Sequence, residues 1–169
     1  MGRGVLSYRC QKETLVNPDG TGYASEVLAE LQRLRQFSAD IEGSIVATTD
    51  GLVVAHDLSA SAAYGVEPEG VAALAAVSLG LSQRISDTAN HGDLLDTVIR
   101  GALGNVVTYA AGERALLTIL VRSSGDLVAL RGRAQQSADR IGDVLADSWQ
   151  DDAASWFSPP EIFLPRRNS

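Results

Sequence analysis

The residue types that could carry out catalysis or hold a metal are few and scattered in this chain. A metal site needs several His, Cys, Asp or Glu side chains that converge on one point. The only histidines are His56 and His91, and neither has a second ligand at metal-binding spacing. Cys10, the only cysteine, has no histidine near it in sequence to activate a thiol. These residues predict neither a metal centre nor a cysteine nucleophile.

Signatures of nucleotide or phosphate binding are also missing. The chain contains neither GxxxxGK[ST] nor GxGxxG at the start of a helix, and GALGN at 101–105 has the composition of a hairpin turn. The GxSxG motif of a serine nucleophile does not occur. The formal net charge of −7 argues against nucleic acid, which calls for a basic surface. We therefore predict no cofactor and no nucleic-acid partner.

The carboxylate that most suggests chemistry is Asp50, inside SIVATTDGLVVAHDL at 44–58. Asp50-Gly51 separates two β-rich runs, and Asp-Gly favours a two-residue turn with positive φ at both positions. The preceding pair Thr48-Thr49 superficially resembles the first strands of N-terminal-nucleophile hydrolases. Cleavage before such a threonine would sever the preceding helix, which has a good core face. The sequence therefore predicts a structural turn at Asp50 and Gly51, and a protein that is not an enzyme.

The elements that surround these residues fit one domain by length. Helical spacing of leucines predicts a helix from Ser25, as its N-cap, to about Ile41. Two strands flank Asp50, and a second helix runs from Pro68 to a stop at Gly92. Three strands follow at about 94–100, 104–110 and 115–122, and then a helix at 127–146. We expect a flexible leader at 1–23, a domain at 24–148 and an irregular tail at 149–169.

The second helix is unusual because no residue from Val71 to Gln83 is charged. One apolar face includes Leu74, Leu81 and Ile85, and we assign it to the core. A second stripe holds Ala72, Ala76 and Leu79, and its small residues would let another helix approach closely. A helix that is apolar nearly all round is buried nearly all round. The second stripe therefore predicts a subunit interface, unless the alanine bias of the chain alone made this surface apolar.

Taken together, the order of elements resembles the roadblock/dynein light-chain family, especially its actinobacterial members. The resemblance covers about residues 24–148: a helix, the GSIVATTDGLVVAHD hairpin, an Ala-rich helix, LLDTVIRGALGNVVTYAAGERALLTILV and a helix ending SADRIGDVL. It implies an α/β (α+β), profilin-like α-β-β-α-β-β-β-α sandwich. In this family a five-stranded antiparallel sheet of order 2-1-5-4-3 carries the middle helix on one face and the terminal helices on the other.

The resemblance also implies a function. Family members are non-enzymatic homodimers that pair their third strands edge to edge, and bacterial ones resemble regulators of small Ras-like GTPases. If the strands pair about Val98, Asp96 of one chain lies opposite Arg100 of the other. Alternatively, the two charges only protect an edge strand from aggregation. The expected dimer interface comprises Ala72, Ala76, Leu79, Gln83, Asp96, Val98 and Arg100.

A second functional class stays open at this point, because profilin-like sheets also occur in small-molecule sensor domains. A sensor needs a ligand cavity, whereas the small alanines of the second helix favour close packing. The longest uncharged run, Val71 to Gln83, is shorter than the ~20 residues of a membrane span. No stretch resembles a signal peptide, so we expect a cytoplasmic protein without membrane insertion.

Overall fold

The computed structural model describes residues 21–156 of the chain. The elements follow the predicted order, with one added 3₁₀ turn at Ala62–Tyr64. The three helices are α1 (Thr21–Phe37), α2 (Pro68–Thr88) and α3 (Leu127–Trp156). The five strands are β1 (Ile41–Thr48), β2 (Val53–Leu58), β3 (Thr97–Arg100), β4 (Gly104–Ala111) and β5 (Ala115–Arg122). The expected α-β-β-α-β-β-β-α order is therefore confirmed.

The strands form one antiparallel sheet of order β2-β1-β5-β4-β3, as the resemblance implied. β5 lies in the centre, and its residues are buried from Ala115 to Val121. A strand buried on both faces loses the apolar–polar alternation of a half-exposed one, which explains the apolar run ALLTILV. β2 and β3 form the two edges, so β3 has only β4 as a backbone partner in this chain.

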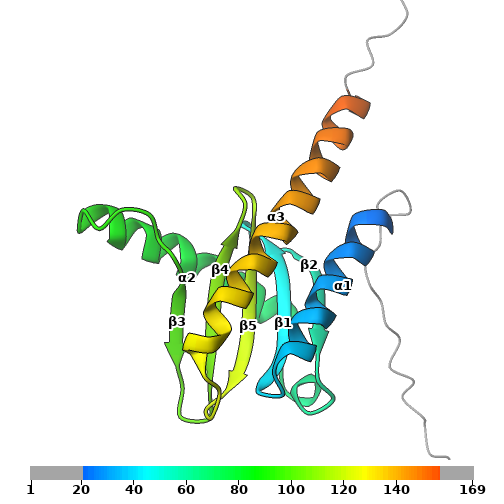
Figure 1. Ribbon diagram of the computed structural model, residues 1–169. Coiled ribbons are helices and arrows are strands. Elements are labelled where there is room, and N and C mark those ends of the chain that lie inside the picture. Colours follow the sequence, from blue (N-terminus) through cyan, green and yellow to red (C-terminus); the bar gives the residue numbers. More distant parts are fainter. Residues whose placement is uncertain (1–20, 157–169) are drawn as a thin grey trace, which may run out of the picture.

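The helices cover both faces of this sheet. Figure 1 shows α1 and α3 side by side on one face and α2 behind the other. Leu117 and Ile119 of β5 belong to the larger core, which includes Leu31 of α1 and Ile141 of α3. Between the sheet and α2 lies a smaller core, made by Ile45, Ala47, Ala72, Ala75 and Leu116. The difference in size follows from the helices, since two pack on one face and one on the other.

The ends of the helices differ from the predicted ones. α1 begins at Thr21, so Ser25 is inside the helix, where its Oγ donates to the carbonyl of Gly22 at 2.7 Å instead of capping it. α2 ends before Gly92: Asn90 takes the left-handed conformation with φ 55°, and the His91 N–H closes the turn on the carbonyl of Ser86. This is the geometry of a helix C-terminal cap, which asparagine as well as glycine can adopt.

The domain boundaries also need correction. α3 continues to Trp156, so the first part of the expected irregular tail, residues 149–156, is helical. Residues 21–23 of the expected leader belong to α1. The rest of the leader, with Cys10, and the rest of the tail, with Phe157, lie outside the described residues. The sequence prediction ended this helix at 146, although Trp149, Ala153 and Trp156 continue the helical spacing of Leu145. Figure 1 shows this last part of α3 extending beyond the sheet.

The β1–β2 hairpin contains the predicted turn in a different form. Gly51 has φ 84°, but Asp50 does not have a positive φ, so the turn is not the expected type I′. The Gly51 N–H donates to the Thr48 carbonyl and the Thr48 N–H to the Leu52 carbonyl, both at 2.8 Å. That pattern is a type I turn followed by a left-handed glycine. A Cβ on Gly51 would also lie 2.8 Å from the Cα of Ala73, so the turn and α2 fit closely.

Candidate functional site

The outer face of α2 carries the largest group of exposed apolar side chains that the structure describes. Leu74, Val77, Leu81 and Ile85 are 72%, 69%, 59% and 61% exposed. They follow one another at spacings of three and four residues, so they form one stripe along the helix. Single exposed leucines are ordinary on protein surfaces, but a continuous apolar stripe marks an interaction site.

The two faces of α2 exchange the roles that the sequence had suggested. Ala72 and Ala75 are buried against the sheet, and Ala76 and Leu79 are partly buried on the same cluster. Ala72 is therefore part of this protomer's own core, with no surface left for a partner. The alanines fit here because small side chains let α2 lie close to the sheet and to the Gly51 turn. The surface available for a second subunit is the leucine-rich stripe.

The far end of α2 extends past the edge strand β3 (Figure 1), and the two elements contact each other. Val98 and Ile99 of β3 are 41% and 52% exposed. Their side chains point to opposite faces of the sheet, because strand residues alternate. Val98 and Ile99, the unpaired backbone edge of β3 and the four side chains of the α2 stripe are called the α2/β3 surface below.

Of the remaining predicted interface residues, Asp96 and Gln83 have side-chain contacts within the chain. Asp96 precedes β3, and its Oδ2 lies 3.4 Å from Nε of Arg131 on α3. Burial, with a contribution from Asp96, raises the pKa of Tyr109 to about 12, while Arg131 acts in the opposite direction. Arg100 is at the exposed end of β3. An Asp96–Arg100 pair between two copies would therefore compete with the Arg131 contact.

Gln83 joins the end of α2 to the connector that leads into β3. Its Nε2 donates to Asp87 Oδ1 at 2.7 Å, and its Oε1 accepts from the backbone N–H of Leu94 at 3.2 Å. This side chain therefore fixes the position of the connector relative to α2. Its place in the structure is that of a support for the α2/β3 surface.

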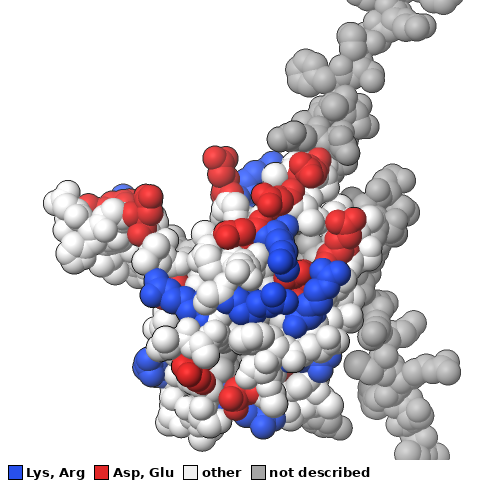
Figure 2. Space-filling view, viewed as in Figure 1, with Lys and Arg blue, Asp and Glu red and all other residues white. Residues whose placement is uncertain are grey.

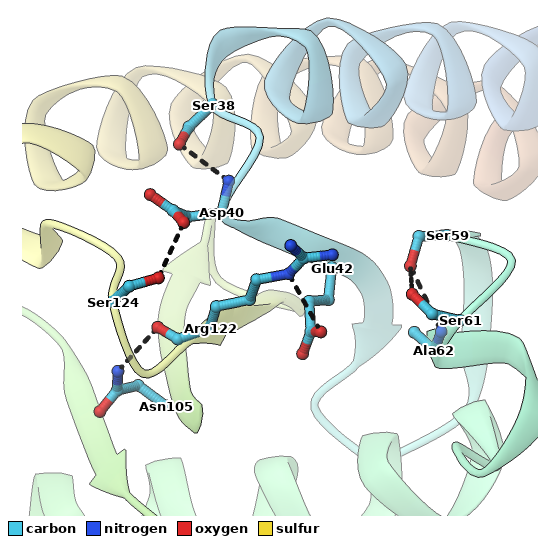
Figure 3. A network of polar contacts seen from close by, with 9 residues as sticks. All are labelled: Ser38, Asp40, Glu42, Ser59, Ser61, Ala62, Asn105, Arg122 and Ser124. Carbon is cyan, nitrogen blue, oxygen red and sulfur yellow. Dashed lines mark hydrogen bonds and ion pairs between the residues drawn. The ribbon is translucent and has the colours of Figure 1, made fainter. Parts of the chain in front are cut away.

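A polar network lies at one end of the sheet (Figure 3). Arg122 Nε lies 3.4 Å from Glu42 Oε1, and the Arg122 carbonyl accepts from Asn105 Nδ2 at 3.3 Å. Ser124 Oγ donates to Asp40 Oδ1 at 3.1 Å. These groups join the α1–β1 turn, β4 and the end of β5, and each carboxylate in the network has a partner within the chain. The network is a structural link between chain segments.

The side chains that could bind a metal are dispersed over residues 21–156. They contain no group of three or more His, Cys, Asp or Glu side chains that could hold a metal ion. His56 and His91 are both exposed and lie on β2 and after α2. None of the helices described is long and apolar enough to cross a membrane. Among the described residues, the α2/β3 surface is therefore the candidate functional site.

Comparisons with known proteins agree with the fold. Residues 24–121 match the model of the Roadblock/LC7 domain. An uncharacterized protein of Methanocaldococcus jannaschii is 33% identical over 115 residues, which are 68% of this chain and 93% of that protein. A second uncharacterized protein of the same organism is 32% identical over the same length and the same shares.

Solved structures show the same architecture. MglB in a tetrameric arrangement has 16% identity and a TM-score of 0.69, covering 75% of this chain and 92% of that one. The gliding protein MglB of Thermus thermophilus has 15% identity and a TM-score of 0.68, covering 75% and 93%. The Roadblock/LC7 domain from Streptomyces avermitilis has 19% identity and a TM-score of 0.62, covering 70% and 97%. At these identities the structures show a common fold.

Proposed function

Because this chain belongs to the Roadblock/LC7 family, we propose that it is a non-enzymatic homodimeric adaptor that binds and regulates a small Ras-like GTPase in bacterial signalling. The observation that supports this proposal most is the α2/β3 surface. We assign this surface two roles. One part joins two copies of the chain, and the resulting dimer presents a composite surface to the GTPase. The protein works in the cytoplasm and needs no cofactor.

The dimer part of the proposal rests on exposed groups that a second copy can cover. A two-fold interface brings the same patch of both subunits together, so the patch must complement itself. Antiparallel pairing of β3 with its copy gives the backbone N–H and C=O groups of this edge hydrogen-bond partners. The same rotation brings the two α2 helices together, so that their leucines cover each other. Burial of apolar surface stabilises such a pair by about 25 cal/mol per Å².

The GTPase part rests on family membership and on the lack of catalytic groups in the described residues. An adaptor without a nucleophile or metal acts on a GTPase by binding one of its conformations better than another. No arginine of this chain needs to enter the GTPase site in this proposal. Binding therefore shifts the GTPase between its conformations, and GTP hydrolysis changes as a result.

The rival function, a small-molecule sensor, has less support. The hollows described in the structure are open grooves of about 470 and 510 Å³ on the outside of the fold. The contact between α2 and the sheet is filled by Ile45, Ala72 and Leu116, which are fully buried. A ligand site of the usual kind is a deeper concave pocket that encloses most of the ligand.

The first test is the solution mass of the full chain and of Leu81→Glu by light scattering. We expect twice 17.8 kDa for the unchanged chain and a folded monomer for Leu81→Glu, since the charge would be buried in the pair. Phe37→Glu is a matched control, because Phe37 is 51% exposed at the end of α1, which packs on the other face of the sheet and contacts the opposite edge strand β2. A monomeric unchanged chain at tens of micromolar, or equal loss of mass in both variants, would contradict the dimer.

The second test uses purified small GTPases from the source genome. We expect one of them to bind the full chain and to change its rate of GTP hydrolysis in its presence. Leu81→Glu should abolish this change, while Phe37→Glu should retain it. If no GTPase is affected by the intact dimer, the regulatory role is wrong even though the dimer exists.

A further inference from the structure

The last part of α3 extends beyond the sheet and past the start of α1 (Figure 1). Leu145 of α3 is fully buried in the core, and Trp149, Ala153 and Trp156 continue its helical spacing in the sequence. Residues at spacings of three and four share one face of a helix. The apolar stripe of α3 therefore continues along residues 149–156, where the sheet no longer lies beneath the helix.

The antiparallel packing of α1 against α3 places the start of the described chain at this end of α3. Glu30 of α1 is only 4% exposed, and its Oε1 accepts from Ser137 Oγ of α3 at 2.8 Å. One turn earlier on α1, Glu26 lines the same groove as Asp143, which lies further along α3. Thr21, the first residue of α1, is therefore close to the point where α3 leaves the core. Residues 1–20 join the domain at this point.

This end of the helix pair is acidic. From residue 141 to residue 156 the sequence has four aspartates and no Lys, Arg or His. Glu26, Asp143 and Asp147 are exposed, and within the described residues none of the three carboxylates has a hydrogen bond or an ion pair. Figure 2 shows acidic side chains toward the upper ends of α1 and α3, with basic side chains in a band below them. The three carboxylates are therefore available to a basic segment.

The arginines of the groove do not cancel this negative charge. Arg33 and Arg140 both pair with the buried carboxylate of Glu30, at 3.0 and 3.3 Å. With Glu26 and Asp143, the groove has two positive and three negative side chains, a net charge of −1. A basic segment is therefore attracted to the groove, most strongly at its acidic end.

The first residues of the chain have the complementary charge. Residues 1–12, MGRGVLSYRCQK, contain Arg3, Arg9 and Lys12 and no acidic residue, although the whole chain carries a net charge of −7. The apolar residues Val5 and Leu6 lie between two of these basic residues. This segment therefore complements both the charge and the apolar stripe at the end of α3.

We propose that residues 1–12 pack on the end of α3 of the same chain, with their basic side chains at Glu26, Asp143 and Asp147 and their apolar side chains on the stripe at 149–156. Residues 13–20 link this segment to α1 and span up to about 26 Å when extended, whereas residues 149–156 form about 12 Å of helix. The link is therefore long enough. Because the segment is tethered beside its site, its effective concentration there is high, and weak surface ion pairs suffice.

The segment after α3 fits this place less well. Residues 157–169 contain two arginines and one glutamate, a net charge of +1 against +3 for residues 1–12. They also follow the tip of α3 at Trp156, so they have to reverse direction to lie on residues 149–156.

The contact has a regulatory consequence. A partner that binds the end of α3 has to displace residues 1–12 first, so the segment acts as an intramolecular competitor. The inference does not depend on dimer formation or on a GTPase, because the end of α3 lies on the face of the sheet opposite α2.

The test places a nitroxide spin label on Cys10, the only cysteine, in the ¹⁵N-labelled full chain. We expect the amide NMR signals of Asp143, Asp147 and Ser148 to lose intensity at low salt, because the label lies close to them. At about 1 M salt, where the screening length falls to about 3 Å, most of this intensity should return. The signals of α2 should stay unchanged.

The charge requirement is tested with the triple variant Arg3→Glu, Arg9→Glu, Lys12→Glu, which leaves residues 21–156 unchanged and should abolish the loss of intensity. A matched control in the other terminal segment is Arg166→Glu, Arg167→Glu, which should retain it.

Tryptophan fluorescence gives a second readout, because both tryptophans of the chain, Trp149 and Trp156, are in the last part of α3. Quenching by acrylamide, which is uncharged, should increase in the triple variant and stay unchanged in the control.

Three results would overturn the inference. The first is full intensity at Asp143 and Asp147 at low salt in the spin-labelled chain. The second is a loss of intensity when spin-labelled chains are mixed with ¹⁵N-labelled Cys10→Ser chains, which would assign the contact to a second copy. The third is increased quenching in Arg166→Glu, Arg167→Glu alone, which would assign the end of α3 to residues 157–169. The dimer test with Leu81→Glu is separate, so failure of one proposal leaves the other intact.

Discussion

The two faces of the sheet differ in how completely their helices are buried against it. On one face, α1 and α3 cover the sheet together and bury Leu31, Leu34, Ile141 and Leu145 completely. On the other face, α2 is alone and fully buries only Ala72 and Ala75, while Leu74 and Leu81 face solvent. A closed face therefore stabilises the protomer, and an open face remains available for association.

The polar contacts of the helices also differ between the two faces of the sheet. On the α1/α3 face a carboxylate is buried and joins the helices through Ser137 and Arg140. On α2 the polar contacts join residues close in sequence: Gln83 contacts Asp87 within one turn and Leu94 in the connector that follows the helix. Long-range polar contacts fix the geometry of the closed face, whereas none that the structure describes fixes the outer side of α2. The following substitutions test this difference, from the largest expected effect to the smallest.

The strongest test of the contrast replaces one leucine on each face. Leu31→Ala should lower the free energy of unfolding by about 2–5 kcal/mol, because the side chain is fully buried and leaves a cavity. In the monomeric Leu81→Glu background, Leu74→Ala should change it by less than about 0.5 kcal/mol. Urea unfolding measures both. A similar cost at both positions would mean that α2 buries its leucines within one protomer.

The buried carboxylate provides the next test. Glu30→Gln should cost about 1.5–3 kcal/mol at pH 7, because charge-assisted hydrogen bonds to Arg33 and Arg140 are weakened. The pKa of Glu30 is lowered in the folded protein, so its ionised form stabilises the fold above the unfolded value of 4.5. This stability is lost as the pH falls through the folded pKa.

The stability difference between the unchanged chain and Glu30→Gln should therefore shrink as the pH is lowered from 7 to below 4.5. Thermal unfolding at a series of pH values measures it. Asp143→Asn is a suitable control, since Asp143 is exposed on α3 and lines the same groove between α1 and α3 as Glu30. A difference for Glu30→Gln that is independent of pH would show that the charge of Glu30 contributes nothing to the contact between the helices.

Much of the architecture was predictable because its signals are local. The strand runs on either side of Asp50-Gly51 and the helix start at Pro68 need only neighbouring residues. The two faces of α2 were not predictable in this way. Both stripes are apolar, and the sequence does not say which one packs on the sheet beside the Gly51 turn, where an added Cβ would lie 2.8 Å from the Cα of Ala73.

Polar contacts over a long sequence separation were equally hidden. Glu30 and Ser137 are far apart in the chain, and the pattern of α1 alone would leave Glu30 available to face water. Its burial depends on the antiparallel packing of α3 against α1, which no local pattern describes. The form of the β1–β2 turn was also not predicted, because Asp50-Gly51 occurs both in two-residue turns and in type I turns followed by a left-handed glycine. The register shift between Val46 and Ala47 lengthens the loop by one residue and so selects the second form.

Two helical glycines, one on each face of the sheet, allow the comparison with the smallest expected effects on stability. A Cβ on Gly142 of α3 would lie 2.7 Å from the backbone nitrogen of Gly112, whereas one on Gly80 of α2 would meet nothing within 4 Å. Gly142→Ala should therefore cost about 1–3 kcal/mol through overpacking against the β4–β5 turn. In the Leu81→Glu monomer, Gly80→Ala should instead stabilise the fold by about 0.5–1 kcal/mol, because alanine favours helix. Thermal unfolding measures both changes in stability, which should have opposite signs.

In the proposed dimer the second α2 lies over Gly80, so Gly80→Ala should stabilise the dimer less than it stabilises the monomer. An equal gain in stability in dimer and monomer would place the partner helix elsewhere.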